Sequence, residues 1–415
     1  AGPYHCENVL IDGRAVLTNS PPFGAFRGFG APQTQFALER HMDRIAAELG
    51  MDPVELRRVN LIRDGQSTAT GQVIQDGADR VVVMERALEM SDFRRRRDEH
   101  DRFNRAHDDR KRGIGLATFF HGAGFTGGGE VRLASVVHVA GLPDGSAEVR
   151  TSNVEMGQGA LTVFTGLAAD RLGCPPSRVR IAPADTHRVP NSGPTVASRT
   201  AMIVGGLVEK ACDDLKKRLG LADGPGGGEV SEAIGAWHVA NPGGELVGEA
   251  RYQKPAHIEW DEETYRGHAY GAYGWGAYVA DVEIDLRTFV ATVRDFVAVQ
   301  EVGKVLNDTL ARGQIQGGVV QGLGWALMEE CKWREGAMEN AQLTNYMGPT
   351  SADVPPIRVD FLEAPYPHGA QGAKGIGELP FDGVAPCVAN AVAQAVGRDP
   401  HEIPLTPERI MALVV

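Results

Sequence analysis

The spacing of apolar side chains predicts both helices and strands along the chain. Residues 33–49 carry apolar side chains at helical spacing, with Pro32 at the expected start and Gly50 at the expected end. Residues 277–303 alternate apolar and polar positions and are interrupted near Asp285, which predicts a β-hairpin. Further strands are expected at 130–140, 146–156 and 178–186, and further helices at 160–172, 195–219, 308–330 and 383–397. This mixture predicts an α/β (α+β) fold with two main domains.

One segment, residues 94–112, is almost entirely charged. A basic run can be a binding patch, but acidic residues are interleaved with the arginines here, which favours a solvated helix or a linker. We place a domain boundary in this segment, so that residues 1–93 precede it and residues 113–415 follow it.

Composition and charge exclude several classes of protein. The 415 residues are 42% hydrophobic and 23% charged, which supports a sizeable folded core. The net charge of −12 argues against general binding to nucleic acid or to anionic membranes. No apolar run reaches the length of about 18 residues that predicts a membrane span. The five scattered cysteines form no CxxC pair, which argues against iron–sulfur clusters within this chain and fits a reducing, cytoplasmic location.

Glycine is the unusual component, with 52 residues, about twice the ordinary share. Four glycine-rich segments precede or open expected helices: 24–33, 154–162, 191–200 and 372–380. Glycine lets the backbone approach a ligand closely, and a helix N-terminus offers free N–H groups. A tight turn explains each loop alone, whereas the four together predict a large, phosphate-bearing cofactor held mainly by main-chain groups.

The sequence lacks the motifs of several other enzyme classes. GxxxxGK[ST], GxSxG and HExxH are absent, which argues against P-loop enzymes, the usual serine hydrolases and zinc peptidases. No paired histidine or cysteine ligand set is present, so we expect no metal held by direct protein ligation. The reactive centre is then expected to belong to a cofactor.

Five segments resemble, in order and spacing, motifs of the molybdenum hydroxylases of the xanthine dehydrogenase/aldehyde oxidase family: GAFRGFGAPQ (24–33), EMGQG (155–159), PNSGPTVAS (190–198), GQIQGGVVQGLG (313–324) and GAKGIGELP (372–380). The resemblance covers nearly the whole chain and corresponds to the C-terminal part of the molybdopterin-binding large subunit. It implies two elongated molybdopterin-binding domains of the xanthine dehydrogenase type. Residues 1–93 would be the C-terminal part of the first, 94–112 a charged linker and 113–415 the second.

The resemblance also implies an activity and a cofactor. In this family a pterin dithiolene holds the molybdenum, and water-derived oxygen enters an electron-poor carbon with hydride transfer to Mo=S. It therefore implies a molybdenum-cofactor-binding catalytic subunit, an oxidoreductase acting on an N-heterocyclic aromatic, purine-like substrate. The choice between molybdopterin and its cytosine dinucleotide form stays open.

Partner chains are implied in the same way. The family's first cofactor loop and its 2Fe–2S and FAD domains have no counterpart in this sequence. The resemblance implies one partner that supplies the other half of the molybdenum site, and further subunits that carry 2Fe–2S clusters and FAD. A dimer of such heteromers is expected.

Two residues are expected to take part in catalysis. Glu378 matches the family's glutamate that takes the proton of the attacking hydroxyl, and we expect a poorly hydrated pocket to raise its pKa toward neutrality. From the residues alone, a helix-capping or surface glutamate is the alternative. Arg27 matches a residue beside the molybdenum, where a fixed cation stabilises negative charge. The alternative is a solvated loop arginine.

Three residues are expected to contact substrate. Phe29 matches an aromatic residue that stacks on the ring in purine hydroxylases, and Phe26 lies in the same loop, although both are also candidates for the core. Leu116 stands where the purine enzymes place a second aromatic residue, which puts purine specificity in question. The loop GAFRGFGAPQ has no cysteine, which disfavours the carbon monoxide dehydrogenase branch.

The resemblance assigns a cofactor-binding role to residues of every glycine-rich segment and of the expected helix 308–330. Main-chain N–H groups, hydroxyls and amides there suit pterin and phosphate acceptors. The residues are Gly28, Gly157, Gln158, Gly159, Ala197, Ser198, Thr200, Gln314 and Gly377. Arg199 is unusual in this setting and is expected to meet a phosphate or an acidic group of a partner.

Two other functions stay open. One is an aldehyde oxidoreductase or a reductive aromatic member of the same family. The other is a non-catalytic cofactor-binding or assembly subunit, against which the intact AFRGFG, EMGQG and GIGELP motifs argue.

Overall fold

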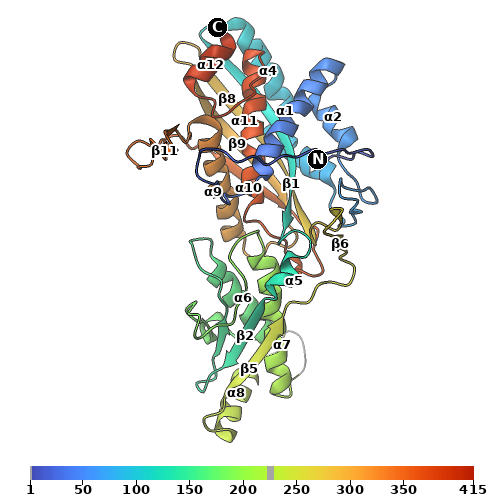
Figure 1. The fold of residues 1–415 in the computed structure, drawn as a ribbon, viewed down its shortest axis with the longest axis vertical. Coiled ribbons are helices and arrows are strands. Elements are labelled where there is room, and N and C mark those ends of the chain that lie inside the picture. The colour runs from blue at the N-terminus through green and yellow to red at the C-terminus, as the bar shows by residue number, and fades with distance from the viewer. Residues whose placement is uncertain (1, 222–228) are drawn as a thin grey trace.

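The computed structural model describes residues 2–221 and 229–415, which form an elongated molecule with a larger upper unit and a smaller lower unit (Figure 1). Each unit is built on a four-stranded sheet. This confirms the mixed α/β (α+β) class that the sequence predicts.

The sheet of the upper unit has the order β1-β8-β9-β12. Neighbouring strands are antiparallel except for β12, which runs parallel to β9. The strands are β1 (Arg110–Ala123), β8 (Ala272–Asp285), β9 (Val290–Glu301) and β12 (Ile357–Leu362). Strands β8 and β9 form the hairpin predicted over 277–303, and β8 ends at Asp285 as expected.

Helices cover both faces of this sheet, and alternate residues of one strand therefore enter two different cores. Tyr278 and Ala280 of β8 pack in the core that contains α9 and α11. Ala277 and Val279 pack in the core that contains α1, α2 and α3. The helices are α1 (Ala31–Leu49), α2 (Pro53–Asn60), α3 (Arg80–Ser91), α9 (Asp308–Leu327) and α11 (Val384–Val396).

The charged segment 94–112 forms most of helix α4 (Phe93–Ala106) and the start of β1. Helix α4 packs against β1, and its Arg96 and His100 side chains contact Asp281 of β8 at 3.2 and 2.9 Å. The segment is therefore a helix attached to the upper sheet. The division of the chain into two cofactor domains at this point stays a prediction.

The lower unit contains the sheet β4-β3-β2-β5, covered by α6, α7 and α8. Its elements are β2 (Val136–Gly141), β3 (Ala147–Arg150), α6 (Ala160–Leu172), β4 (Val179–Ile181), α7 (Gly205–Arg218), α8 (Glu229–Ala240) and β5 (Leu246–Arg251).

Two predicted elements begin later than expected. The predicted strand 130–140 opens with a short helix, α5 (Gly129–Leu133), because Glu130 turns inward to a buried ion pair with Arg199. The predicted helix 195–219 begins at a π-helical turn, η2 (Thr200–Val204). The residues before it, Ala197 and Ser198, have positive φ angles, which a right-handed helix does not allow.

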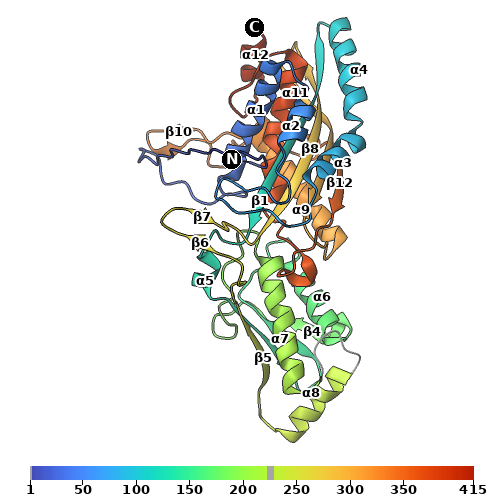
Figure 2. The same cartoon turned by 90° about the vertical axis from the view of Figure 1, so that its right-hand side faces the viewer.

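Shorter elements complete the two units, and Figure 2 shows the lower end of α9 above α6 and α7 at their junction. They are η1 (Pro176–Arg178), β6 (Trp260–Asp261), β7 (Arg266–Gly267), β10 (Trp333–Arg334), β11 (Ala337–Met338), η3 (Ala370–Gly372), α10 (Leu379–Asp382) and α12 (Pro407–Val414). Among the residues described, no helix combines the length and apolar character that crossing a membrane requires.

Candidate cofactor and substrate site

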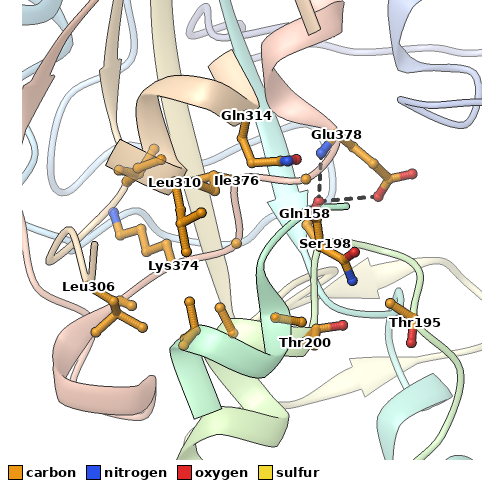
Figure 3. A pocket seen from close by; sticks show the side chains of 18 of the residues that line it. Gln158, Thr195, Ser198, Thr200, Leu306, Leu310, Gln314, Lys374, Ile376 and Glu378 are labelled. Carbon is orange, nitrogen blue, oxygen red and sulfur yellow. Dashed lines mark hydrogen bonds between the residues drawn. The ribbon is translucent and has the colours of Figure 1, made fainter. Parts of the chain in front are cut away.

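A cavity of about 460 Å³ lies at the junction of the two units (Figure 3). All four glycine-rich segments singled out in the sequence contribute to its wall. The wall is made of residues within 25–27, 156–164, 195–201, 302–314 and 373–378. Segments that are far apart in the sequence thus meet around one space.

The structure brings most of the predicted site residues to this cavity. Those that line it are Phe26, Arg27, Gln158, Ala197, Ser198, Thr200, Gln314, Gly377 and Glu378. Gly28, Gly157 and Gly159 lie in the same loops without lining the cavity.

Phe29 and Leu116, both expected to contact substrate, do not line the cavity. Phe29 is 72% exposed at the surface. Leu116 is 3% exposed and packs in the core formed by α1, α2, α3 and the upper sheet. Successive side chains of β1 point to opposite faces of the sheet, and that of Leu116 points away from the face that carries α10 and α11. The structure therefore gives Leu116 a packing role.

Glu378 is held at the wall by Ser198 (Figure 3) and by His121 of strand β1. Its backbone N–H donates to Ser198 Oγ at 3.0 Å, and the Ser198 hydroxyl donates to Glu378 Oε2 at 3.4 Å. The Nε2 atom of His121 lies 3.5 Å from the same oxygen. Although Glu378 occupies the N-cap position of α10, its side chain makes no capping hydrogen bond, so the capping alternative does not describe it.

The expected rise in the pKa of Glu378 is wrong for this chain. Burial by itself raises the pKa of this carboxyl group. The hydrogen bond and positive charge of His121, with smaller help from Ser198 and the Gly28 N–H, outweigh burial and hold the pKa below its ordinary value. Glu378 is therefore ionised at neutral pH and able to accept a proton.

Arg27 joins two parts of the cavity wall. Its Nε donates to the carbonyl oxygen of Gly377 at 2.7 Å, and its Nη2 donates to the carbonyl oxygen of Gln314 at 3.1 Å. Burial lowers the pKa of this guanidinium, while the nearby Tyr278, Glu378 and Asp382 act in the opposite direction. Arg27 is thus a fixed cation beside Glu378 and differs from a solvated loop arginine.

The loop before η2 is fixed by a buried ion pair. Arg199 is fully buried, donates to Glu130 Oε2 at 2.9 Å and to Ser135 Oγ at 2.7 Å, and also donates to the Ser192 carbonyl oxygen at 2.9 Å. The expectation that Arg199 meets a phosphate or a partner's acid is wrong, because these groups satisfy its guanidinium inside the chain. The pair instead holds Ala197 and Ser198 at positive φ, a backbone conformation that needs such support.

The N-terminus of α6 is capped by the chain itself. The Glu155 carboxylate accepts the N–H groups of Gly157 and Gly159, both at 2.8 Å, and of Leu161 at 3.1 Å. Gln158 donates to the Val154 carbonyl oxygen of its own loop. The free N–H groups that the glycine pattern led us to expect here are therefore occupied by Glu155.

Gly375 brings the loop of Glu378 against the loop of Ser198. A Cβ atom at position 375 would lie 1.9 Å from the Ser198 carbonyl oxygen, so the close approach that glycine allows here is between two protein segments.

Gly375→Ala is expected to cost about 1–3 kcal/mol of stability, because backbone must move to admit the methyl group. Thermal unfolding of the wild type and of Gly375→Ala measures this loss. The matched control is Gly317→Ala on the exposed side of α9, where a Cβ meets nothing within 4 Å and where alanine favours the helix. Equal effects of the two changes would contradict the close contact.

Sequence reasoning missed two residues of this site, His121 and Asp382. His121 Nδ1 lies 2.7 Å from Asp382 Oδ2, directly behind Glu378. Two signals were available: Asp382 follows Glu378 by four positions at helical spacing, and His121 stands in the strand that carries Leu116.

The donors at the cavity fit an organic cofactor that brings its own metal ligands. Within residues 2–221 and 229–415, no group of three or more His, Cys, Asp or Glu side chains could hold a metal ion. The wall presents hydroxyl, amide and guanidinium groups, from Thr195, Ser198, Thr200, Gln314 and Arg27. These donors suit the carbonyl, amino and phosphate groups of a pterin.

Comparison with known families supplies the decisive observation. The sequence model of the molybdopterin cofactor-binding domain matches residues 86–355, and a second model of the same description matches residues 1–61. The chain belongs to the molybdopterin cofactor-binding domain family.

Relatives of this molybdopterin-binding chain cover almost all of it. It is 30% identical to an aldehyde oxidoreductase of Megalodesulfovibrio gigas over 98% of the chain and 43% of that protein. It is 31% identical to the putative xanthine dehydrogenase molybdenum-binding subunit XdhA of Escherichia coli over 96% of the chain and 54% of that subunit. The solved structure of quinoline 2-oxidoreductase from Pseudomonas putida 86 superimposes with a TM-score of 0.80 at 28% identity, over 95% of the chain and 53% of that structure. The chain spans about half the length of these relatives.

Proposed function

We propose that this molybdopterin-binding chain is the catalytic part of a heteromeric hydroxylase of the xanthine dehydrogenase type. The observation that carries the proposal is the cavity wall on which an ionised Glu378 and a fixed Arg27 lie together with pterin-compatible donors. The membership in the cofactor-binding family supports the identity of the bound group.

The cofactor, when bound, supplies the two-electron oxidation and the oxygen transfer. Glu378 accepts the proton that is released when oxygen attacks the substrate, since an ionised carboxylate beside a cavity is suited to this step. Ser198 and His121 orient that carboxylate through its Oε2 atom. Arg27 joins the loop of Gly377 to Gln314 of helix α9 and provides a positive charge for the developing anion.

The proposed substrate is an N-heterocyclic aromatic, purine-like compound. Phe26 lines the cavity next to Arg27 and stacks edge-on against Phe381 at a centroid distance of 5.7 Å, which presents an aromatic ring at the cavity wall. Phe29 lies away from the cavity, and position 116 is a leucine in the core, so neither of these predicted positions brings a second aromatic contact to the ring. An aldehyde is therefore the second candidate substrate, and the aldehyde oxidoreductase among the relatives supports it.

Partner chains are proposed to complete the molybdenum site. The segment 7–30 projects from the upper unit (Figure 2) with strongly exposed apolar side chains: Leu10, Ile11, Val16, Leu17, Phe23, Phe26 and Phe29. Such a density of exposed apolar groups is typical of an interface. The partner that supplies the other half of the molybdenum site is proposed to bind this segment. The 2Fe–2S clusters and FAD are proposed to lie on further chains, and the complex is proposed to be cytoplasmic. All five cysteines are free thiols, which supports that location.

The test is the composition of the native complex. Purification through this chain, followed by metal analysis, flavin measurement and subunit masses, is expected to give molybdenum and pterin together with iron and FAD. The nucleotide released from the pterin identifies its form, and turnover of a purine-like ring against an aldehyde separates the two substrates. A pure complex without molybdenum refutes the proposal. A complex with molybdenum but no oxidoreductase activity favours the assembly subunit.

A further inference from the structure

His121 lies between two carboxylates at the end of strand β1. Its Nδ1 atom is 2.7 Å from Asp382 Oδ2, and its Nε2 atom is 3.5 Å from Glu378 Oε2. One imidazole ring therefore contacts the carboxylate that lines the cavity and a second carboxylate behind it.

The fold produces this arrangement from two simple periodicities. Glu378 and Asp382 are four residues apart at the two ends of α10, which places them on one side of a helical turn. Along β1, residues 117, 119 and 121 share one face, and Ala117 and Phe119 pack in the core that contains α11. His121 thus points from the sheet to α10.

Asp382 needs a cationic partner because it has no access to solvent. Its side chain is 0% exposed, and its Oδ1 atom has no hydrogen-bond partner among the described residues. A buried carboxylate is stable only when it is paired or protonated. Its Oδ2 atom meets the His121 ring, which makes His121 the ion partner of Asp382.

The other groups around His121 leave this pairing intact. From the loop 24–30, Arg27 interacts with both carboxylates at longer range, but its donors are directed to Gly377 and Gln314. From the loop before η2, Ser198 donates to Glu378 Oε2. From β8, Tyr278 donates its hydroxyl to the Pro380 carbonyl oxygen.

We propose that His121 and Asp382 are positioning residues for Glu378: Asp382 fixes the imidazole through Nδ1, and the ring holds the Glu378 carboxylate ionised and oriented through Nε2. The inference rests on the proposed role of Glu378 as proton acceptor. It adds two residues that act through Glu378 without touching the substrate.

The charge states agree with this arrangement. Burial opposes the charged imidazole, but Asp382 and Glu378 together raise the pKa of His121 to about 10. Burial raises the pKa of Asp382 to about 6, against the attraction of His121. At a pH between these two values, Asp382 is an anion, His121 is a cation and Glu378 is an anion. Removing the imidazolium should raise the pKa of Glu378. As the pH is lowered, activity that needs the Glu378 carboxylate should therefore be lost at a higher pH than in the wild type.

The first experiment measures kcat/KM against pH in the complete molybdenum-loaded complex. His121→Asn is expected to move the acid limb upward by about one to three pH units, the usual effect of one opposite charge. Asp382→Asn is expected to move it in the same direction, because the imidazole loses its anchor. His138→Asn is the matched control, since His138 pairs with Glu249 at 2.8 Å on β2 and β5. An acid limb that stays in place in both site variants overturns the proposal.

The second experiment does not depend on activity. In the complex carrying histidine labelled with ¹³C at Cε1, the resonance missing from His121→Asn identifies His121. This resonance is expected to keep the chemical shift of an imidazolium up to pH 8 in the wild type, and to titrate at lower pH in Asp382→Asn. A wild-type resonance that titrates near the ordinary histidine value overturns the pairing. If Glu378→Gln keeps full turnover while His121 stays charged, the proposed role of Glu378 fails and the ion pair stands.

Discussion

Replacing Glu378 by glutamine is expected to lower kcat/KM by about 10²- to 10⁴-fold, the usual contribution of a positioned general base. Glutamine has the same shape and can still receive the Ser198 hydroxyl hydrogen bond that now goes to Oε2. It has no negative charge and cannot accept a proton at neutral pH. Turnover should therefore fall while the cavity keeps its form.

The measurement combines steady-state kinetics with molybdenum and pterin content of the same preparation. Both contents are expected to equal those of the wild type in Glu378→Gln. Glu262→Gln is the matched control, because Glu262 is an exposed carboxylate that pairs with Arg132 at 2.8 Å, and neither residue lines the cavity. Unchanged turnover in Glu378→Gln would contradict the assignment, and a loss of molybdenum would show that Glu378 acts in cofactor retention.

Local patterns predicted the elements whose formation depends on neighbouring residues. Helix α1 begins at Ala31, with Pro32 in its first turn, and ends before Gly50. The β8–β9 hairpin turns after Asp285. Both were predictable because capping and alternation are encoded within a few positions. Nine of the site residues that the resemblance implied line the cavity. Arg27 and Gly377, which are 350 positions apart, form a hydrogen bond across it.

The features that the sequence did not reveal depend on contacts between distant segments. The pKa of Glu378 was expected to rise, and its direction is reversed by His121, which comes from another strand. The resemblance implied that Leu116 contacts substrate, whereas the alternation of side chains along β1 points it into the core beneath α1, α2 and α3. Arg199 was expected to bind an external anion, but Glu130 from α5 neutralises it inside the chain. In each case the deciding partner has no fixed spacing from the residue it controls.

Breaking the buried ion pair between Arg199 and Glu130 is expected to lower stability strongly. Arg199→Met is expected to lower the free energy of unfolding by about 3–5 kcal/mol, because it leaves the Glu130 carboxylate buried without its partner. The side chains are 0% and 6% exposed, so water cannot replace the guanidinium. Thermal and urea unfolding of the complete protein measure the loss.

A double-mutant cycle separates the ion pair from simple loss of packing. Arg199→Met combined with Glu130→Gln should be less destabilised than the sum of the two single changes, since no isolated charge remains. Arg132→Met is the matched control, on the helix α5 that also carries Glu130. The ion pair of Arg132 with Glu262 is exposed, and such pairs contribute about 0–1 kcal/mol. Because Arg199 also holds Ala197 and Ser198 at positive φ, the single Arg199 variant should lose molybdenum at temperatures where the wild type retains it. Additive effects in the cycle, with molybdenum content unchanged, would mean that the loop keeps its conformation without the pair.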